Sequence, residues 1–151
     1  MFTNPDFNAI SSLLGKAHRI AVVGLSADSS RPSHQVALGM QSLGYRIVPV
    51  TPHGGTLLGE TCYPDLAAAA TTQSRFGAID IVNVFRRPEH VADIVSQCLH
   101  LAFPALWLQD GVIDEEATER ARSGGMFVVM DRCIWRDRVR LGHSGAAADA
   151  G

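Results

Sequence analysis

Arginines and small polar residues follow apolar segments at two places in this chain. The first is the loop that begins at Gly24, after the β-branched run Ile20–Val23, and it carries Ser26, Ser29, Ser30, Arg31 and Ser33. Backbone N–H groups between a strand and a helix, together with the positive end of that helix, commonly bind phosphate. We therefore predict that this loop holds a diphosphate. A plain loop in which Ser33 only caps the helix is the alternative interpretation.

The same loop departs from the dinucleotide fingerprint. Only Gly24 stands where G-x-G-x-x-G has three glycines. An NAD-binding domain usually has an acid at the end of its next strand, where it binds the ribose. Here that strand is followed by Thr51 and Pro52, and no acid comes before Glu60. This apolar segment suits the wall of an adenine pocket, or it simply ends a strand.

The second place is Asn83-Val84-Phe85-Arg86-Arg87-Pro88, two arginines at a predicted strand end. We expect at least one arginine to contact a ligand, with Arg86 reaching a phosphate and Phe85 packing on an apolar chain. The alternative is that one arginine pairs with Asp80 or Glu89 and the other is solvated. Further along, Gln109 and Gly111 are expected to line the far end of the groove, with Trp107 in the core.

No catalytic set stands out in the sequence. The six histidines show no metal-ligand spacing, and there is no G-x-S-x-G motif. The proton donors available near the groove are Asp110, His53 and Cys133. For the segment Asp131-Arg132-Cys133 we expect an Asp–Arg ion pair beside a buried cysteine rather than a reactive thiol.

Strands and helices alternate along the chain. Apolar runs predict strands at 20–23, 45–50, 79–85, 105–108 and 126–130, with a short extended piece near 57–58 and a polar linker at 71–77. Helices are expected at the N-terminus, from Ser33 to Leu43 with Val36, Leu38, Met40 and Leu43 on the apolar side, at 65–70, from Pro88, at 114–122 and at 134–141. This pattern predicts an α/β, Rossmann-like fold: an open, mostly parallel sheet of five or six strands with helices on both faces. We divide the chain into an N-terminal helix (1–18), one ligand-binding domain (19–141) and a flexible tail (142–151).

Composition limits the classes of function. The chain has 151 residues, of which 46% are hydrophobic and 19% charged, and its net charge is −2. Such a chain has no overall basic field for nucleic acid. It shows no signal peptide and no apolar run long enough for a membrane span. The three cysteines are far apart in the sequence, which argues against a disulfide framework or a zinc site and favours a reducing, cytoplasmic location.

Several ordered motifs are similar to those of a known family. They are Ile20–Ser26 with Arg31–Ser33, Gly44–Val50, Gly59-Glu60, Cys62–Pro64, Asn83–Arg87, Trp107–Gln109, Gly111-Val112 and Val129–Cys133. Together they resemble the small stand-alone CoA-binding proteins, which are similar to the CoA-binding domain of the succinyl-CoA synthetase α subunit. The resemblance covers about residues 19 to 141.

The resemblance implies that CoA or acyl-CoA binds at the carboxyl ends of the strands. It implies diphosphate and 3′-phosphate contacts from Gly24, Leu25, Ser26, Arg31, Pro32 and Ser33, and an adenosine border of Thr51 and Pro52. It places Val84, Phe85 and Arg86 along the pantetheine arm, with Gln109 and Gly111 beyond. Two positions depart from the family pattern, because Thr51 stands where asparagine is common and Asn83 where aspartate is common.

The resemblance implies a ligand but no reaction, because the catalytic histidine of the synthetase lies in a later domain. We therefore expect a CoA-binding protein without catalysis of its own, as a monomer or homodimer, with any protein partner unknown. An NAD(P)-dependent or acyl-CoA-processing enzyme is the alternative, and a regulatory subunit whose interface is ordered by CoA is a third interpretation.

Overall fold

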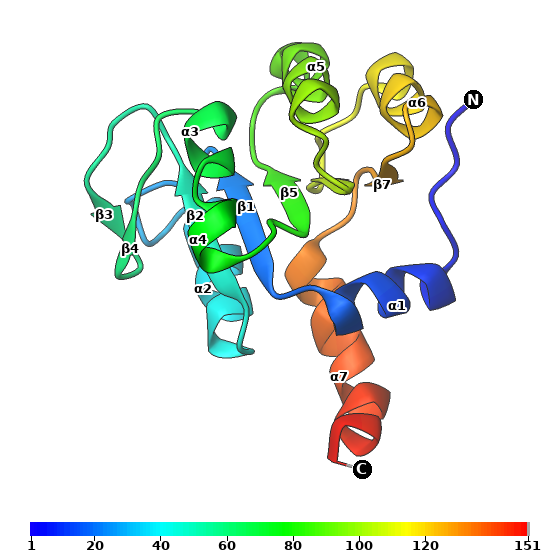
Figure 1. Cartoon of the computed structure of the whole chain (residues 1–151). Coiled ribbons are helices and arrows are strands. Elements are labelled where there is room, and N and C mark those ends of the chain that lie inside the picture. The colour runs from blue at the N-terminus through cyan, green and yellow to red at the C-terminus, as the bar shows by residue number, and fades with distance from the viewer. Residues whose placement is uncertain (151) are drawn as a thin grey trace.

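The computed structural model describes the backbone of residues 1–150 and the side chains of residues 1–142. Its main sheet has five strands, all parallel, in the order β2-β1-β5-β6-β7. These strands are β1 (Arg19–Val23), β2 (Arg46–Val50), β5 (Ile81–Val84), β6 (Ala105–Leu108) and β7 (Phe127–Val129). A small antiparallel pair, β3 (Thr56–Leu57) and β4 (Glu60–Thr61), projects beside β2 (Figure 1). The expected α/β, Rossmann-like fold is confirmed, with five strands.

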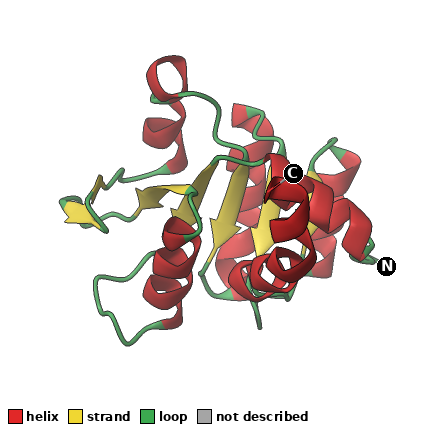
Figure 2. Cartoon of the chain, turned by 90° about the horizontal axis from the view of Figure 1, so that it is seen from below, coloured by secondary structure: helices red, strands yellow, loops and turns green. Residues whose placement is uncertain are grey.

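Helices cover both faces of the sheet (Figures 1 and 2). One face packs against α1 (Phe7–Lys16), α2 (Pro32–Ser42) and α7 (Ile134–Ala150). The other packs against α3 (Leu66–Ala70), α5 (Val91–Leu101), which a short 3₁₀ turn at Pro88–His90 precedes, and α6 (Glu115–Ser123). The strands are therefore buried on both sides, and every residue of β1, β5 and β6 is buried. Continuous apolar strands of this kind are typical of a parallel sheet between two helical layers.

Two expectations about α2 are wrong. The N-cap residue is Arg31 rather than Ser33, because Pro32 occupies the first helical position, where its missing N–H costs nothing. Leu38 and Leu43 are exposed, at 47% and 40%, so they do not form the buried side of this helix. That side contains Gly39, where an added Cβ would lie 2.3 Å from the Trp135 ring. The close approach lets α2 pack directly against α7.

Two further segments differ from the sequence-based expectation. The polar stretch 71–77 is not only a linker, because it contains the short helix α4 (Gln73–Phe76). The last helix extends beyond Leu141 to Ala150. The sequence predicts a flexible tail at 142–151. The side chains after residue 142, and residue 151 itself, lie outside the described part of the chain.

Candidate functional site: a cavity at the carboxyl ends of the strands

The order of the strands creates a switch point between β1 and β5. From β1 the chain passes through α2 to β2 on one side, and it later returns to β5 on the other side. Connections leave in opposite directions from such a point, and open α/β sheets bind ligands in the crevice that results. The carboxyl ends of β1, β5 and β6 are followed by Gly24, Phe85 and Gln109, and all three residues line one cavity.

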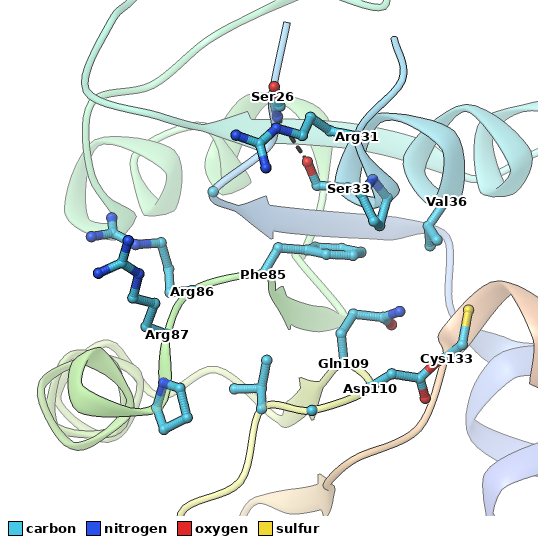
Figure 3. A pocket seen from close by; sticks show the side chains of 15 residues that line it. Ser26, Arg31, Ser33, Val36, Phe85, Arg86, Arg87, Gln109, Asp110 and Cys133 are labelled. Carbon is cyan, nitrogen blue, oxygen red and sulfur yellow. Dashed lines mark hydrogen bonds between the residues drawn. The ribbon is translucent and has the colours of Figure 1, made fainter. Parts of the chain in front are cut away.

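This main cavity has a volume of about 720 Å³. Figure 3 shows Arg86 and Arg87 at one end, and Val36 and Cys133 at the opposite end. Guanidinium groups thus lie at one end of the cavity, whereas the other end combines the Val36 side chain and the Cys133 sulfur with the Asp110 carboxylate. Its walls are formed by Gly24, Ser26, Arg31, Pro32, Ser33, Val36, Phe85, Arg86, Arg87, Pro88, Gln109, Asp110, Gly111, Val112 and Cys133.

Position 24, in the first loop, requires glycine for two reasons. Its φ is +88°, a conformation that side chains rarely adopt, and an added Cβ would lie 2.7 Å from the backbone oxygen of Phe85. The Gly24 N–H donates to the Val50 oxygen at 3.0 Å. The close contact with Phe85 brings the loop after β1 against the end of β5, so that both reach the same cavity.

Side-chain hydrogen bonds fix the shape of the rest of this loop. The Ser26 N–H donates to the Ser33 hydroxyl at 3.0 Å, and the Ser30 hydroxyl donates to the Asp28 carboxylate at 2.7 Å. The hydroxyl and N–H of Ser30 hold the pKa of Asp28 below its ordinary value. The His34 ring lies 2.9 Å from the Ser26 oxygen. The loop is therefore already folded around the start of α2, and Ser33 serves as an internal brace in it.

Arginine side chains at this end are available to a ligand. Within the described part of the chain, Arg31 and Arg86 form no ion pair, whereas Arg87 lies 3.9 Å from Glu89 in an exposed pair. The alternative interpretation of this arginine pair is thus correct for Arg87 and Glu89. Asp80 accepts instead from the backbone N–H groups of residues 18 and 19.

Gln109 is the most constrained polar group of the cavity. It is only 4% exposed, and its Oε1 accepts from the Ile134 N–H at 2.9 Å and from Asn83 Nδ2 at 3.2 Å. Since the oxygen is fixed by two donors, Nε2 is the atom left to face the cavity. It donates to no acceptor among the described residues. Asn83, which also donates to the Trp107 oxygen, is 1% exposed and therefore supports Gln109 from beneath.

The acidic residue of the cavity is neutralised. Both carboxylate oxygens of Asp110 accept from Arg136, at 2.9 and 2.8 Å, and this contact holds the pKa of Asp110 below its ordinary value. The neighbouring Arg132 is bound in the same two-pronged way by Asp137, at 2.7 and 2.8 Å. The expected ion pair beside Cys133 therefore exists, but its acid is Asp137. Asp131 instead accepts from the Gly111 N–H.

A second, smaller cavity of about 200 Å³ lies at the end of β2. Pro52 and Arg86 both line it, so Arg86 stands between the two cavities. Asp65 and Asp93 also line it; Asp65 caps α3 by accepting from the Ala68 N–H. The main cavity thus lies at the carboxyl ends of β1, β5 and β6, and the smaller cavity lies at the carboxyl end of β2.

The structure brings most of the sequence-predicted residues together. Of these, Gly24, Ser26, Arg31, Pro32, Ser33, Phe85, Arg86, Gln109 and Gly111 line the main cavity, and Pro52 lines the smaller one. Leu25, Thr51 and Val84 are buried and line neither cavity, and Ser29 is exposed outside both. The Thr51 N–H donates to the Tyr63 oxygen at 2.9 Å.

Six residues of the main cavity were not in the binding set that the sequence predicted. They are Val36, Arg87, Pro88, Asp110, Val112 and Cys133. Val36 lies three residues after Ser33 on one helix face, a spacing that could have identified it. Cys133 follows the end of β7, so the rule of strand ends also applies to it. Trp107, expected in the core, is fully buried, and its ring N–H donates to the Arg132 oxygen.

The described residues contain no group of three or more His, Cys, Asp or Glu side chains that could hold a metal ion. None of their helices combines the length and apolar character that crossing a membrane requires.

Comparisons with known proteins match one family model and several relatives. A family model described as a CoA binding domain matches residues 18–138. The uncharacterised protein YneT of Bacillus subtilis (strain 168) is 40% identical over 131 residues, which cover 87% of this chain and 93% of YneT. A Thermus thermophilus protein of solved structure is 32% identical, with a TM-score of 0.81, and the match covers 91% of this chain and 99% of that one. A hypothetical protein from Pyrococcus horikoshii OT3 is 27% identical, with a TM-score of 0.80, over 93% and 98% of the two chains.

Proposed function

Because the chain belongs to the family of CoA-binding domains, we propose that it binds CoA or an acyl-CoA in the main cavity. The observation that carries this proposal is the polarity of that cavity. The unpaired Arg86 stands with Arg87 at one end, and Val36, Gln109 and Cys133 line the other. CoA has the same polarity, since its phosphates and its thiol lie at opposite ends of the molecule.

In the proposed complex the phosphates lie near Arg31 and Arg86. Arg31 precedes α2, so the positive end of this helix and the guanidinium act on the same anion. The adenosine then enters the smaller cavity beside Pro52, and the pantetheine arm passes Phe85 toward Gln109. The free Nε2 of Gln109 is a suitable donor for an amide carbonyl of that arm.

We further propose that the protein binds this ligand without catalysing a reaction. Of the three available proton donors, Asp110 is held as a carboxylate by Arg136. His53 is exposed and lines neither cavity, while Cys133 is a thiol at the end of the main cavity. The cysteines of the described part are free, which agrees with the proposed cytoplasmic location.

Calorimetric titration of the full chain with CoA and with NAD tests the proposal. NAD is the informative competitor, because Asp65 and Asp93 in the smaller cavity are carboxylates that a ribose could use. We expect CoA to bind and NAD to bind at least about a hundredfold more weakly. Binding of NAD with an affinity equal to or above that of CoA would contradict the proposal.

A charge-removal variant locates the phosphates. Arg31→Ala should weaken CoA binding by about 10–150-fold, corresponding to the roughly 1.5–3 kcal/mol of a charge-assisted hydrogen bond. The matched control is Arg75→Ala, since Arg75 is exposed on α4 and lines neither cavity. Pantetheine, which lacks the nucleotide, should bind both variants equally. An equal loss for pantetheine and CoA would remove Arg31 from phosphate contact.

A further inference from the structure

Cys133 occupies a position that the proposed binding of CoA does not explain. It lies at the end of the main cavity opposite Arg86 and Arg87 (Figure 3). The residue is 8% exposed, and it lines the cavity. Cys62 and Cys98 are also buried, but they line neither of the two cavities. One thiol of the three is therefore placed where the reactive end of a bound CoA would arrive.

A second observation at the same end points to a ligand. Gln109 is 96% buried, since its exposed fraction is 4%, and its Nε2 has no acceptor among the described residues. Figure 3 shows its amide group directed toward the end at which Cys133 lies. The Gln109 oxygen accepts from two donors, so Nε2 is the group left to donate to a ligand carbonyl in the cavity. The pantetheine arm has amide carbonyls close to its thiol, so a carbonyl held at Gln109 brings that thiol toward Cys133.

The sulfur of Cys133 is also fixed in direction. The Arg136 N–H donates to it at 3.4 Å, in the first turn of α7. The guanidinium of Arg136 is bound to Asp110, and that of Arg132 is bound to Asp137, so neither is free to cover the thiol. The sulfur is thus held by the backbone and left open to the cavity.

We infer that Cys133 is a covalent redox site, at which oxidised CoA leaves one CoA joined to the protein through a mixed disulfide. The inference rests on the proposed binding of CoA. The co-reactant is CoA disulfide. The deprotonated Cys133 sulfur attacks one sulfur of this disulfide, a new S–S bond forms, and the old one breaks. The second CoA leaves as a thiolate and takes up the proton that Cys133 lost. Cys133 is oxidised, and the leaving CoA is reduced.

This site distinguishes chemical states of the ligand. Reduced CoA binds reversibly, an acyl-CoA has its sulfur blocked by the acyl group, and only the disulfide form becomes attached. The protein then retains one CoA until a thiol reductant releases it.

The test is intact-mass measurement of the full chain after incubation with CoA disulfide. We expect the mass to increase by one CoA less two hydrogens, one from each thiol, with the modification mapped to the Cys133 peptide of the wild-type protein and reversed by dithiothreitol. Glutathione disulfide has the same S–S bond but no nucleotide, so it is the control. It should react at least about tenfold more slowly, because binding in the cavity raises the local concentration of CoA disulfide at Cys133. Cys133→Ser should abolish the adduct, whereas Cys62→Ser and Cys98→Ser should retain it.

The inference would be overturned by an adduct on Cys62 or Cys98, and equally by equal rates with the two disulfides. Failure of the proposed function is recognised separately, by titrating the reduced protein with reduced CoA. If this titration shows binding and no adduct forms with CoA disulfide, the redox site is refuted and the binding proposal remains. If it shows no binding, the proposed function itself has failed. Circular dichroism of Cys133→Ser checks that this variant is folded, and peptide mapping of the wild type requires no variant.

Discussion

Gln109 connects the cavity to the start of α7, and replacing it gives the clearest test of the site geometry. Methionine is the informative substitution, because it fills a similar straight-chain volume without the amide oxygen. Gln109→Met leaves the Ile134 N–H without its acceptor, and Ile134 is fully buried. It also removes one of the two acceptors of Asn83 Nδ2, which keeps its bond to the Trp107 oxygen.

The size of the effect follows from these two losses. An orphaned buried donor costs about 1–3 kcal/mol, and a lost ordinary hydrogen bond about 0.5–1.5 kcal/mol. Water that enters from the cavity satisfies part of the first loss, so we expect the free energy of unfolding to fall by about 1–4 kcal/mol. For a chain of this length, that change lowers the melting temperature by roughly 2–16 °C.

Urea unfolding followed by circular dichroism measures this loss, and no ligand is needed. The control is Gln35→Met, since Gln35 is exposed on α2 and makes only long contacts of 3.4 Å to the Ser29 and Ser30 oxygens. This control should stay within about 0.5 kcal/mol of the wild type. If Gln109→Met is equally mild with an unchanged denaturant slope, the Gln109 oxygen does not accept these bonds and Nε2 is not the group that faces the cavity.

Two other substitutions test the walls of the cavity. Gly24→Ala should lower the free energy of unfolding by at least about 2 kcal/mol, because the new Cβ meets the Phe85 oxygen at a positive φ; a thermal melt within a degree of the wild type would refute this contact. Asp110→Asn should reduce stability at neutral pH and leave it unchanged in acid. The pKa of Asp110 is lowered in the folded state, so the contribution of its pair with Arg136 is present above the ordinary value of 3.8 and is lost as the pH falls through the folded value. A difference between wild type and variant that stays constant from pH 7 to strongly acidic pH would contradict this assignment.

The sequence was sufficient for the fold and for the general location of the cavity, because both depend on periodicity. Continuous apolar strands predict a parallel sheet, and the carboxyl ends of such strands meet at one edge. Arg31, Arg86 and Gln109 could therefore be assigned to one region from the sequence. The same reasoning predicts which residues lie near the cavity, but not which of their side chains point into it. Leu25 and Val84 are close to the site in the sequence, but they are buried and line neither cavity.

What the sequence could not show depends on contacts between distant segments. Ser33 has the residue type of a helix cap, but its hydroxyl accepts from Ser26, and the helix begins earlier at Pro32. Asp131 adjoins Arg132 in the sequence, but Arg132 pairs with Asp137 one turn into α7. In both cases a residue has two partners within reach, and the surrounding packing selects one of them.

The position of Cys133 follows from the same packing. The bond from the Ile134 N–H to Gln109 holds the first residue of α7 at the end of β6, and the packing of Gly39 against Trp135 holds the next residue of that helix against α2. Because α2 begins at the proposed phosphate-binding loop and α7 begins directly after Cys133, these two contacts set the distance between the two ends of the cavity. A ligand that reaches both ends must match that distance, and this requirement favours an extended molecule with an anionic head over a compact one.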